Sequence, residues 1–521
     1  MDSGCPDPAP IRQGFAAVIV DPRTGEAHAA CGARSEVTVY WVREGRTLVL
    51  SSHLRSLLDA QSAPSFDEER MARYLWGVSG PDETMYTGVS RLPAGHHARL
   101  TADALPRVER WFWPQRAEPS ARADFPDFFR QVIEEAVAES LPASGQVASH
   151  LSGGLDSTIV AAIAARRAVE QGTHIQALSH LVAPERWPDW MTREGDDTPF
   201  VEAFARATPG VTLHRFDVPG RPLLSSTKAL FESSAYPILN PINAPWILDI
   251  KNWIRDHDVA LVLTGVHGSL GYSISRSHQY RRAIAAGQFG LLSRDAKARH
   301  AAGARWRHIA STTAQEFAPR LTSAGLRVLG RVTPQAWVGT RPLLITPRPP
   351  DAPRSPVGMR DRHWWTQSVL LDTVAQSAMQ YPVAAAWESD PLGDSEVLRA
   401  LFSAPPSAWL GDGMDRALAR RTMKGLVVDD VRLRAKRGLQ SADFGFAVQG
   451  QQAEYRLALE EVSESPLAQK FIDIPRLQAS MDPEVPHRDR AALDWQLSEG
   501  RILGFGMYLA WIEGFLRRPR D

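Results

Sequence analysis

Cysteine is scarce in this chain, which carries only Cys5 and Cys31 among its 521 residues. Two cysteines exclude a disulfide framework and argue against a cysteine-based zinc site, which fits a reducing compartment. Long apolar runs are also lacking, because no stretch approaches the roughly 18 consecutive apolar residues of a membrane helix. Residues 1–13 contain acids and prolines but no apolar core, unlike a signal peptide. We therefore expect a cytoplasmic protein with no membrane span.

The chain also has no excess of positive or negative charge, since 59 Lys and Arg residues balance 59 Asp and Glu residues. This balance predicts neither nucleic acid nor a membrane surface as a partner. Basic residues are nevertheless concentrated at 276–362, where sixteen Arg or Lys residues accompany four Asp or Glu residues. The segment is either a solvated basic face or a surface that steers an acidic peptide or a partner protein by charge.

A chain of this length is expected to form two or more domains. The first, over residues 1–118, is predicted to be β-rich, because short apolar runs alternate with turn residues. Its expected elements are strands at 14–22, 36–41, 47–52 and 97–101 and a helix at 67–77. Polar residues at 115–124 are typical of a linker.

From residue 125 the pattern changes to strands that alternate with helices. The expected strands are 146–151, 175–182, 212–217 and 259–264, and the expected helices are 127–139, 157–171, 199–207 and 245–257. This alternation predicts an α/β fold with a parallel sheet covered on both faces. The remainder, 285–521, is expected to be mostly helical, with a Pro-rich exposed loop at 342–356.

A glycine-rich turn joins the strand at 146–151 to the next helix. Its residues are Ser152, Gly153, Gly154, Leu155, Asp156, Ser157 and Thr158. Glycines let the backbone approach a ligand closely, and the N–H groups at a helix start favour an anion. Asp156 would repel a bare phosphate, so its presence predicts Mg²⁺ between this carboxylate and phosphate oxygens. The alternative is a glycine-rich βα turn without a ligand; a Walker A pattern is absent from the chain.

The turn resembles the pyrophosphate-binding loop of the N-type ATP pyrophosphatases, and the order of motifs resembles asparagine synthetases and their relatives. Residues 84–96, the second glycine-rich loop 264–273 and residues 415–438 carry the wider resemblance. It implies a degenerate glutaminase-like domain of the N-terminal-nucleophile type at 1–118. An ATP-pyrophosphatase synthetase domain would follow at 125–521. The resemblance further implies that a carboxylate attacks the α-phosphate of Mg-ATP, giving an acyl-adenylate while the loop holds pyrophosphate.

The resemblance also implies site residues beyond the first loop. Segment 415–438 places Lys436 on the family's catalytic lysine, whose charge would stabilise the tetrahedral intermediate and the leaving AMP. The alternative for Lys436 is a basic helix end, which needs no function. In the second loop, Gly265, Gly268 and Ser269 would offer backbone N–H groups to phosphate or substrate, although the family's usual acid is missing there.

Four acids have weaker support. Glu388 lies one position out of register with the family's catalytic glutamate, and Asp390 follows it. Either would orient the nucleophile or act as a base, and the alternative for both is a solvated surface acid. The pair Asp196–Asp197 stands where the family has an acid near ATP, or it caps a helix.

Departures from the family pattern reduce the number of activities that the sequence is consistent with. Glutamine-using synthetases begin with a catalytic cysteine, whereas Gly14 takes that position here and Cys5 lies outside the strand. The first domain is also short, so we expect no glutamine hydrolysis and an amine that arrives with the substrate. β-Lactam synthetases and lasso-peptide cyclases fit this description, and the second loop and segment 415–438 resemble the cyclases more.

The predicted reaction therefore joins the N-terminal amine of a precursor peptide to an Asp or Glu side chain. A leader peptidase of the same pathway is the expected protein partner. The alternatives are a β-lactam synthetase-like or other small-molecule amide ligase, or a non-catalytic scaffold that only binds a peptide.

Overall fold

The computed structural model describes most of the chain. The described residues are 8, 11–12, 14–33, 37–76, 80, 82–101, 103–112, 120, 122, 124–183, 196–217, 222–238, 241–317, 344–345, 386–435, 438, 451–480 and 490–518. Most of the expected linker at 115–124 and of the Pro-rich loop at 342–356 lies outside these ranges. Among the described residues, no helix has both the length and the apolar character needed to cross a membrane.

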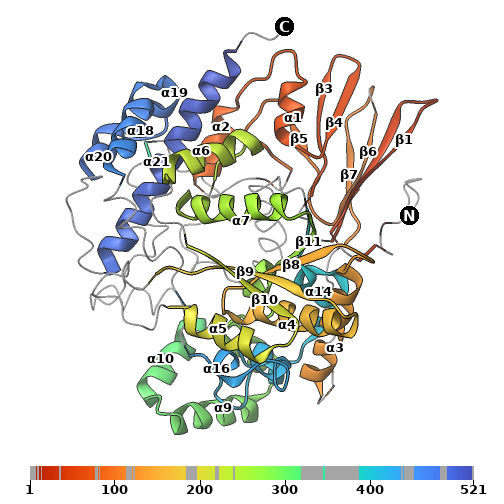
Figure 1. Cartoon of the computed structure of the whole chain (residues 1–521), viewed down its shortest axis with the longest axis vertical. Coiled ribbons are helices and arrows are strands. Elements are labelled where there is room, and N and C mark those ends of the chain that lie inside the picture. Colours follow the sequence, from red (N-terminus) through yellow and green to blue (C-terminus); the bar gives the residue numbers. More distant parts are fainter. Residues whose placement is uncertain are drawn as a thin grey trace.

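Two antiparallel sheets form the N-terminal part of the chain (Figure 1). One has the order β1 (Ala16–Asp21), β2 (Glu26–Cys31), β6 (His96–Leu100), β7 (Arg107–Arg110). The other has the order β4 (Thr47–Ser51), β3 (Tyr40–Glu44), β5 (Ser90–Arg91). Alternation along β2 buries Ala27, Ala29 and Cys31, which share a core with Trp41 of β3. The two sheets therefore pack against each other through small side chains.

The β-rich character predicted for this region is confirmed, with differences in detail. The run at 36–41 is a strand only from Tyr40, and the helix at 67–77 is α2 (Glu68–Leu75), which Asp67 caps by accepting from Arg70 N at 2.9 Å. β2 and the short helix α1 (Leu54–Asp59) were not predicted. Alanine favours strands weakly, so β2 exists because its alternation matches the buried face of the sheet.

The central part is a five-stranded parallel sheet, as predicted. Its order is β10 (Val211–Phe216), β9 (Ile175–His180), β8 (Gln146–His150), β11 (Val259–Leu263), β12 (Trp387–Ser389). Three of the expected helices are α4 (Leu155–Glu170), α5 (Thr198–Ala207) and α7 (Ala244–Asp256). β12 is too short for its pattern to be recognised in the sequence, and it joins the sheet by pairing with β11.

Helices cover both faces of this sheet (Figure 1). α7 packs on one face, where Ile250 and Ile254 share a core with Ala148 and Leu178. The opposite face carries α4 together with α3 (Phe125–Ser140) and α14 (Ser395–Ser403). Since β9 lies on one side of β8 and β11 on the other, the strand order reverses at β8. Ligands of open α/β sheets bind at such a switch point, beyond the carboxyl ends of the strands.

The rest of the described chain is helical. Between β11 and β12 lie η4 (Val266–Leu270), η5 (Arg276–Gln279), α8 (Tyr280–Ala285), α9 (Phe289–Ala301) and α10 (Trp306–Phe317). After β12 come η8 (Pro391–Gly393), η9 (Pro406–Ala408), α15 (Ala417–Thr422) and α16 (Asp429–Arg432). The last group is α18 (Gln452–Glu464), α19 (Pro466–Gln469), α20 (Ile474–Ser480) and α21 (Arg490–Leu516).

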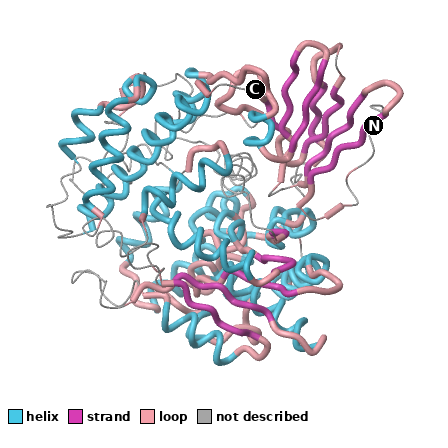
Figure 2. The backbone as a smooth tube through the Cα atoms, turned by 45° about the horizontal axis from the view of Figure 1, so that its top comes forward, coloured by secondary structure: helices cyan, strands magenta, loops and turns pink. Residues whose placement is uncertain are grey.

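The C-terminal helices share a core with the N-terminal part and with α6 (Leu223–Ser234), which follows β10. The hydroxyl oxygens of Tyr86 and Tyr508 lie 2.9 Å apart, and both hydroxyls donate to the carbonyl oxygen of Ala235. Figure 2 shows the N-terminal strands and the parallel sheet as separate groups of magenta strands. Helices therefore connect the two strand-containing parts of the chain.

Candidate active site

The phosphate loop predicted at 152–158 follows β8, the central strand, and its residues 155–158 form the first turn of α4. Gly153 has a φ of +66°, a left-handed conformation that glycine adopts without strain. Ser157 Oγ accepts from the backbone N–H of Ser152 at 3.1 Å and lies 3.0 Å from Ser152 Oγ. Gly154 precedes the first turn of α4. The loop thus presents a helix N-terminus at the edge of the sheet, which favours an anionic ligand.

Leu155 and Thr158, also predicted to line this loop, have buried side chains. Leu155 belongs to the core between α4 and α3, and the Thr158 side chain is fully buried. Neither side chain is exposed at the loop, and the backbone N–H of Thr158 donates to the carbonyl oxygen of Gly154 at 3.3 Å.

The second glycine-rich loop lies directly on the start of α4. A Cβ atom at Gly265 would come within 2.7 Å of backbone atoms of Asp156 and Ser157, and a Cβ atom at Gly268 would overlap the Asp156 side chain. Glycine is therefore required at both positions for the two loops to meet. Ser273, just after η4, donates its hydroxyl to Asp156 Oδ2 at 3.0 Å. The side chain of Ser269, the third predicted residue of this loop, lies outside the described part of the chain.

Asp390 holds the second loop in place through hydrogen bonds. Its Oδ2 accepts from the backbone N–H of His267 at 2.9 Å and lies 2.6 Å from His267 Nδ1, while its Oδ1 accepts from Leu392 N at 3.0 Å. Both the Asp390 and the His267 side chains are almost fully buried. The solvated-surface alternative for Asp390 is thus wrong, and these contacts orient the loop that touches Asp156.

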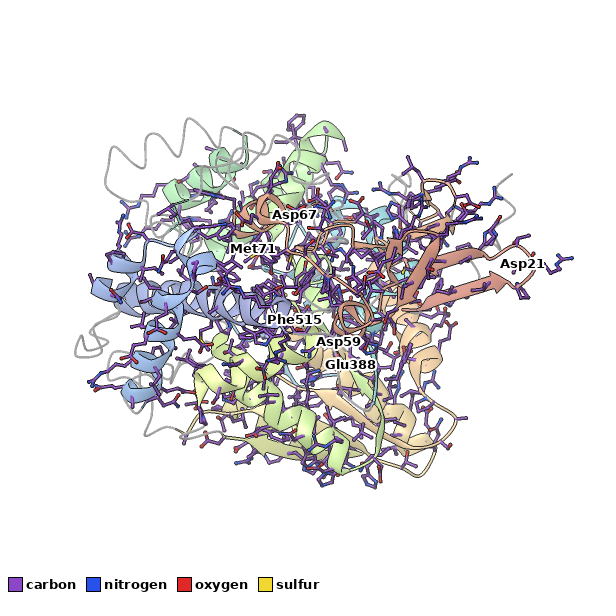
Figure 3. All side chains as sticks on the ribbon, turned by 90° about the horizontal axis from the view of Figure 1, so that it is seen from above. Asp21, Asp59, Asp67, Met71, Glu388 and Phe515 are labelled. Carbon is purple, nitrogen blue, oxygen red and sulfur yellow. The ribbon has the colours of Figure 1, made fainter. Side chains whose placement is uncertain are left out.

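Glu388 lies within β12, opposite Val262 of β11, and near the middle of the molecule in Figure 3. Its carboxylate is 3.7 Å from Nζ of Lys251 on α7, and the Lys251 side chain is only 9% exposed. His150, the last residue of β8, interacts electrostatically with both Glu388 and Lys251. Burial lowers the pKa of His150, the charge of Glu388 acts against this shift and that of Lys251 adds to it. Glu388 therefore belongs to a partly buried charged group on the α7 side of the sheet.

Lys436 lies outside the described residues, as does its neighbour Arg437. The described residues on either side in the sequence, Arg434 and Gly438, both contact Asp197 at the start of α5. The Arg434 guanidinium forms an ion pair with the Asp197 carboxylate. Burial raises the pKa of Asp197, and the charge of Arg434 opposes that shift.

A magnesium ion fits the residues at the phosphate loop. Asp156 offers a carboxylate at a helix N-terminus, and Mg²⁺ is commonly held by one or two carboxylates together with substrate phosphates and water. Within the described ranges, no group of three or more His, Cys, Asp or Glu residues is arranged to hold a metal by itself. Nucleotide phosphates would therefore have to complete the coordination.

Cys31 is the free cysteine in the described part of the N-terminal region. Gly14, which the sequence resemblance places at the family's nucleophile position, has no side chain. Cys31 is buried, and burial raises the pKa of its thiol to about 11, although contacts with Thr38 and Val39 oppose the shift. A thiol with such a pKa is a poor nucleophile near neutral pH. Cys5 lies outside the described residues.

Four residues at the site were not predicted from the sequence as functional. They are Ser273, His267, Lys251 and Arg434. Ser273 and His267 lie in the second loop. The sequence of that loop points to its glycines, Ser269 and the missing acid, and it indicates no role for these two residues. Arg434 lies in segment 415–438, where the sequence resemblance assigned a role only to Lys436. Each contacts a partner more than one hundred residues away in the chain, which no local pattern could indicate.

A parallel sheet with a glycine-rich loop and a carboxylate at its switch point defines a nucleotide-binding α/β domain of the ATP-pyrophosphatase type. The family model described as asparagine synthase matches residues 129–512, which is most of the chain. The chain belongs to the asparagine synthase family, a family of ATP-dependent amide ligases. The match begins after the two N-terminal antiparallel sheets.

Individual relatives are similar over shorter stretches. A protein of Mycobacterium tuberculosis described as a candidate glutamine-hydrolysing asparagine synthetase is 35% identical over 127 residues, covering 22% of this chain and 20% of that protein. Glutamine-hydrolysing asparagine synthetase 3 of Bacillus subtilis is 22% identical over 208 residues, covering 39% of this chain and 34% of that protein. The similarity thus spans about a fifth to a third of the length of these relatives.

Proposed function

We propose that this chain is an ATP-dependent amide ligase that activates a carboxylate as an acyl-adenylate. The observation that carries this proposal is the phosphate loop, which presents Asp156 at a helix N-terminus against the glycines of a second loop. A carboxylate oxygen of the substrate attacks the α-phosphate of ATP, and pyrophosphate leaves. The loop N–H groups hold the departing pyrophosphate. Mg²⁺, when bound by Asp156, supplies positive charge that neutralises the phosphate oxygens.

In the second step an amine nitrogen attacks the acyl carbon, loses its proton and displaces AMP. Negative charge develops on the tetrahedral intermediate and on the leaving phosphate. Lys436 supplies the ammonium that stabilises this charge more in the transition state than in the ground state. Its assignment rests on the resemblance of segment 415–438 to the family.

We further propose that carboxylate and amine belong to one precursor peptide, as in lasso-peptide cyclases. Support comes from the first domain, where Gly14 replaces the nucleophile and Cys31 is buried with a raised pKa, so ammonia from glutamine has no evident source among the described residues. Holding both groups of one peptide makes the second step effectively unimolecular. A leader peptidase of the same pathway is the proposed protein partner.

Two other functions remain candidates. A β-lactam synthetase-like or other small-molecule ligase would use the same phosphate loop with a smaller substrate. A scaffold that only binds a peptide is favoured by Val266, which is 55% exposed in the loop where the family usually carries an acid. The partly buried hydrogen bond from Ser273 to Asp156 favours an intact nucleotide site over the scaffold.

Exchange of labelled pyrophosphate into ATP tests the proposal. The short precursor peptide encoded beside this gene, where one is present, is the probe, and a variant of that peptide with all Asp and Glu residues replaced is the control. We expect exchange only with the acidic peptide, because the proposed adenylation uses an Asp or Glu side chain and the control peptide keeps only its terminal carboxylate. ATP binding without exchange would favour the scaffold, and exchange driven by a small carboxylic acid would favour the small-molecule ligase.

Replacing Cys5 with alanine should leave amide formation unchanged, and glutamine should not serve as nitrogen donor. The reason is that Cys5 lies outside the first predicted strand, while Gly14 takes the nucleophile position. The measurement is glutamate release from glutamine by the wild type and by Cys5→Ala. Glutamate released by the wild type and lost in the variant would show that the first domain is a working glutaminase.

A further inference from the structure

The segment that approaches Lys436 in the sequence is held by a buried arginine. Arg420, on α15, is 6% exposed and donates to three carbonyl oxygens. Its Nε donates to Asp415 at 2.8 Å, its Nη1 to Arg432 at 2.6 Å and its Nη2 to Arg434 at 2.6 Å. Because three donors of one planar group are fixed, the backbone at 432 and 434 has little freedom to move.

Asp197 holds the same segment from the other side. The Arg434 guanidinium pairs with the Asp197 carboxylate and lies 3.9 Å from the centroid of the Phe200 ring, and the Arg434 side chain is only 8% exposed. At Gly438 any Cβ atom would overlap the Asp197 carboxylate. The carboxylate is therefore contacted by residues two positions before and two positions after Lys436, which itself lies outside the described residues.

Asp197 also adjoins the phosphate loop. Its carbonyl oxygen accepts from Phe200 N and Val201 N, both at 3.1 Å, which forms the first turn of α5. A Cβ atom at Gly153 would lie 3.3 Å from side-chain atoms of Phe200 and Val201 and 3.4 Å from the Asp197 carbonyl oxygen. The first turn of α5 thus packs against the glycine of the loop while its aspartate contacts segment 434–438.

Helix capping does not account for this aspartate. Asp197 occupies the N-cap position of α5, yet its side chain makes no capping hydrogen bond. Asp196 instead accepts from Thr198 N at 2.8 Å. Two adjacent acids therefore have different roles, since Asp196 satisfies the helix start and the Asp197 carboxylate points to Arg434 and Gly438.

We propose that Asp197 is a positioning residue, which holds Arg434 and Gly438 beside the phosphate loop and thereby assists the step assigned to Lys436, which lies between them in the sequence. The proposal rests on the proposed ligase function and deepens it. Asp197 contacts neither reacting group in this scheme. Its loss should therefore impair the step that depends on segment 434–438, the attack of the amine, more than the formation of the adenylate.

The half-reactions separate this role from a general structural one. Asp197→Ala should lower amide formation by about tenfold or more, while pyrophosphate exchange falls by less than about threefold, because remote misplacement of a catalytic segment mainly affects the step that uses it. Asp197→Asn should give a smaller loss of amide formation, since it keeps the shape and loses the charge paired with Arg434. Asp196→Ala is the matched control, in which the ratio of the two activities should stay that of the wild type.

The overlap at Gly438 provides a second, independent test. Gly438→Ala should lower amide formation about tenfold in the wild-type background, where a Cβ atom meets the Asp197 carboxylate, and less than about twofold in the Asp197→Ala background, where space is available. Hydrogen–deuterium exchange of peptides covering 429–438 should be faster in Asp197→Ala and unchanged in Asp196→Ala. This measurement needs no substrate.

Equal losses of exchange and amide formation in Asp197→Ala, or additive effects of the two alanines, would overturn the positioning role. Unchanged deuterium uptake would show that Asp197 does not hold the segment. A wild type that shows no exchange with any carboxylate would contradict the proposed ligase function instead, and the uptake result would still decide whether Asp197 fixes the segment.

Discussion

Asp156→Asn should abolish amide formation while leaving the fold intact. The substitution keeps the shape of the side chain and its place at the start of α4, but it removes the charge that would hold Mg²⁺ on the phosphates. Loss of one such electrostatic contribution typically lowers the rate by about 10²–10³, and a metal ligand is expected at the upper end of that range. Ser273 still finds an oxygen acceptor in asparagine, so the contact between the two loops is retained.

The measurement is AMP release with the peptide substrate, together with thermal melting and with ATP affinity as a function of Mg²⁺ concentration. The variant should melt near the wild type and lose the Mg²⁺ dependence of ATP binding. Asp59→Asn is the control, because Asp59 pairs with Arg55 on α1, which lies well apart from α4 in Figure 1. Wild-type turnover by Asp156→Asn would exclude a role for this carboxylate in metal binding.

Lys436→Ala should reduce amide formation by about 10²–10³, roughly 3–4 kcal/mol, and change ATP affinity little. A charge used mainly in the transition state lowers turnover and leaves ground-state binding nearly intact. Pyrophosphate exchange should therefore survive in this variant, since adenylation precedes the step that the lysine assists. Single-turnover amide formation, with ATP affinity measured separately, provides the readout.

Arg437→Ala is the matched control, as it removes the adjacent positive charge from the same segment. If the segment were only a basic helix end, Lys436→Ala and Arg437→Ala would lower the rate of amide formation to the same extent. If both variants lose less than about tenfold and to the same extent, Lys436 is not the stabilising cation. The basic segment 276–362 would then be the place to look for one.

The sequence alone identified the parts of the fold that depend on local pattern. Alternation of strands and helices from residue 125 onward predicted the parallel sheet, and the expected strands at 146–151, 175–182, 212–217 and 259–264 are present with nearly the expected bounds. Such elements are predictable because side-chain periodicity and turn residues are properties of neighbouring residues. The phosphate loop was recognisable for the same reason, since its glycines, hydroxyls and carboxylate occupy seven consecutive positions.

The roles of the acids outside that loop could not be predicted in this way. Asp390 and Glu388 are two residues apart in the sequence, yet one fixes the second glycine-rich loop through His267 and the other pairs with Lys251 on α7. β12 ends at Ser389, and Asp390 is already the N-cap of η8, so strand alternation does not determine where its side chain lies. The partners of the two acids are set by the packing of α7 on the sheet and of the second loop against η8, which no local pattern encodes.

By itself the sequence determined the α/β class and the glycine-rich turn that carries Asp156, because these features follow from residues adjacent in the chain. Only the tertiary structure decided which residues meet there. Ser273 reaches Asp156 across 117 residues, His267 reaches Asp390 across 123, and Arg434 reaches Asp197 across 237. Contacts of this kind form when distant elements pack around shared cores, so their partners are fixed by the strand order and the helix packing. The division between Asp196, which caps α5, and Asp197, which contacts segment 434–438, is of this second kind.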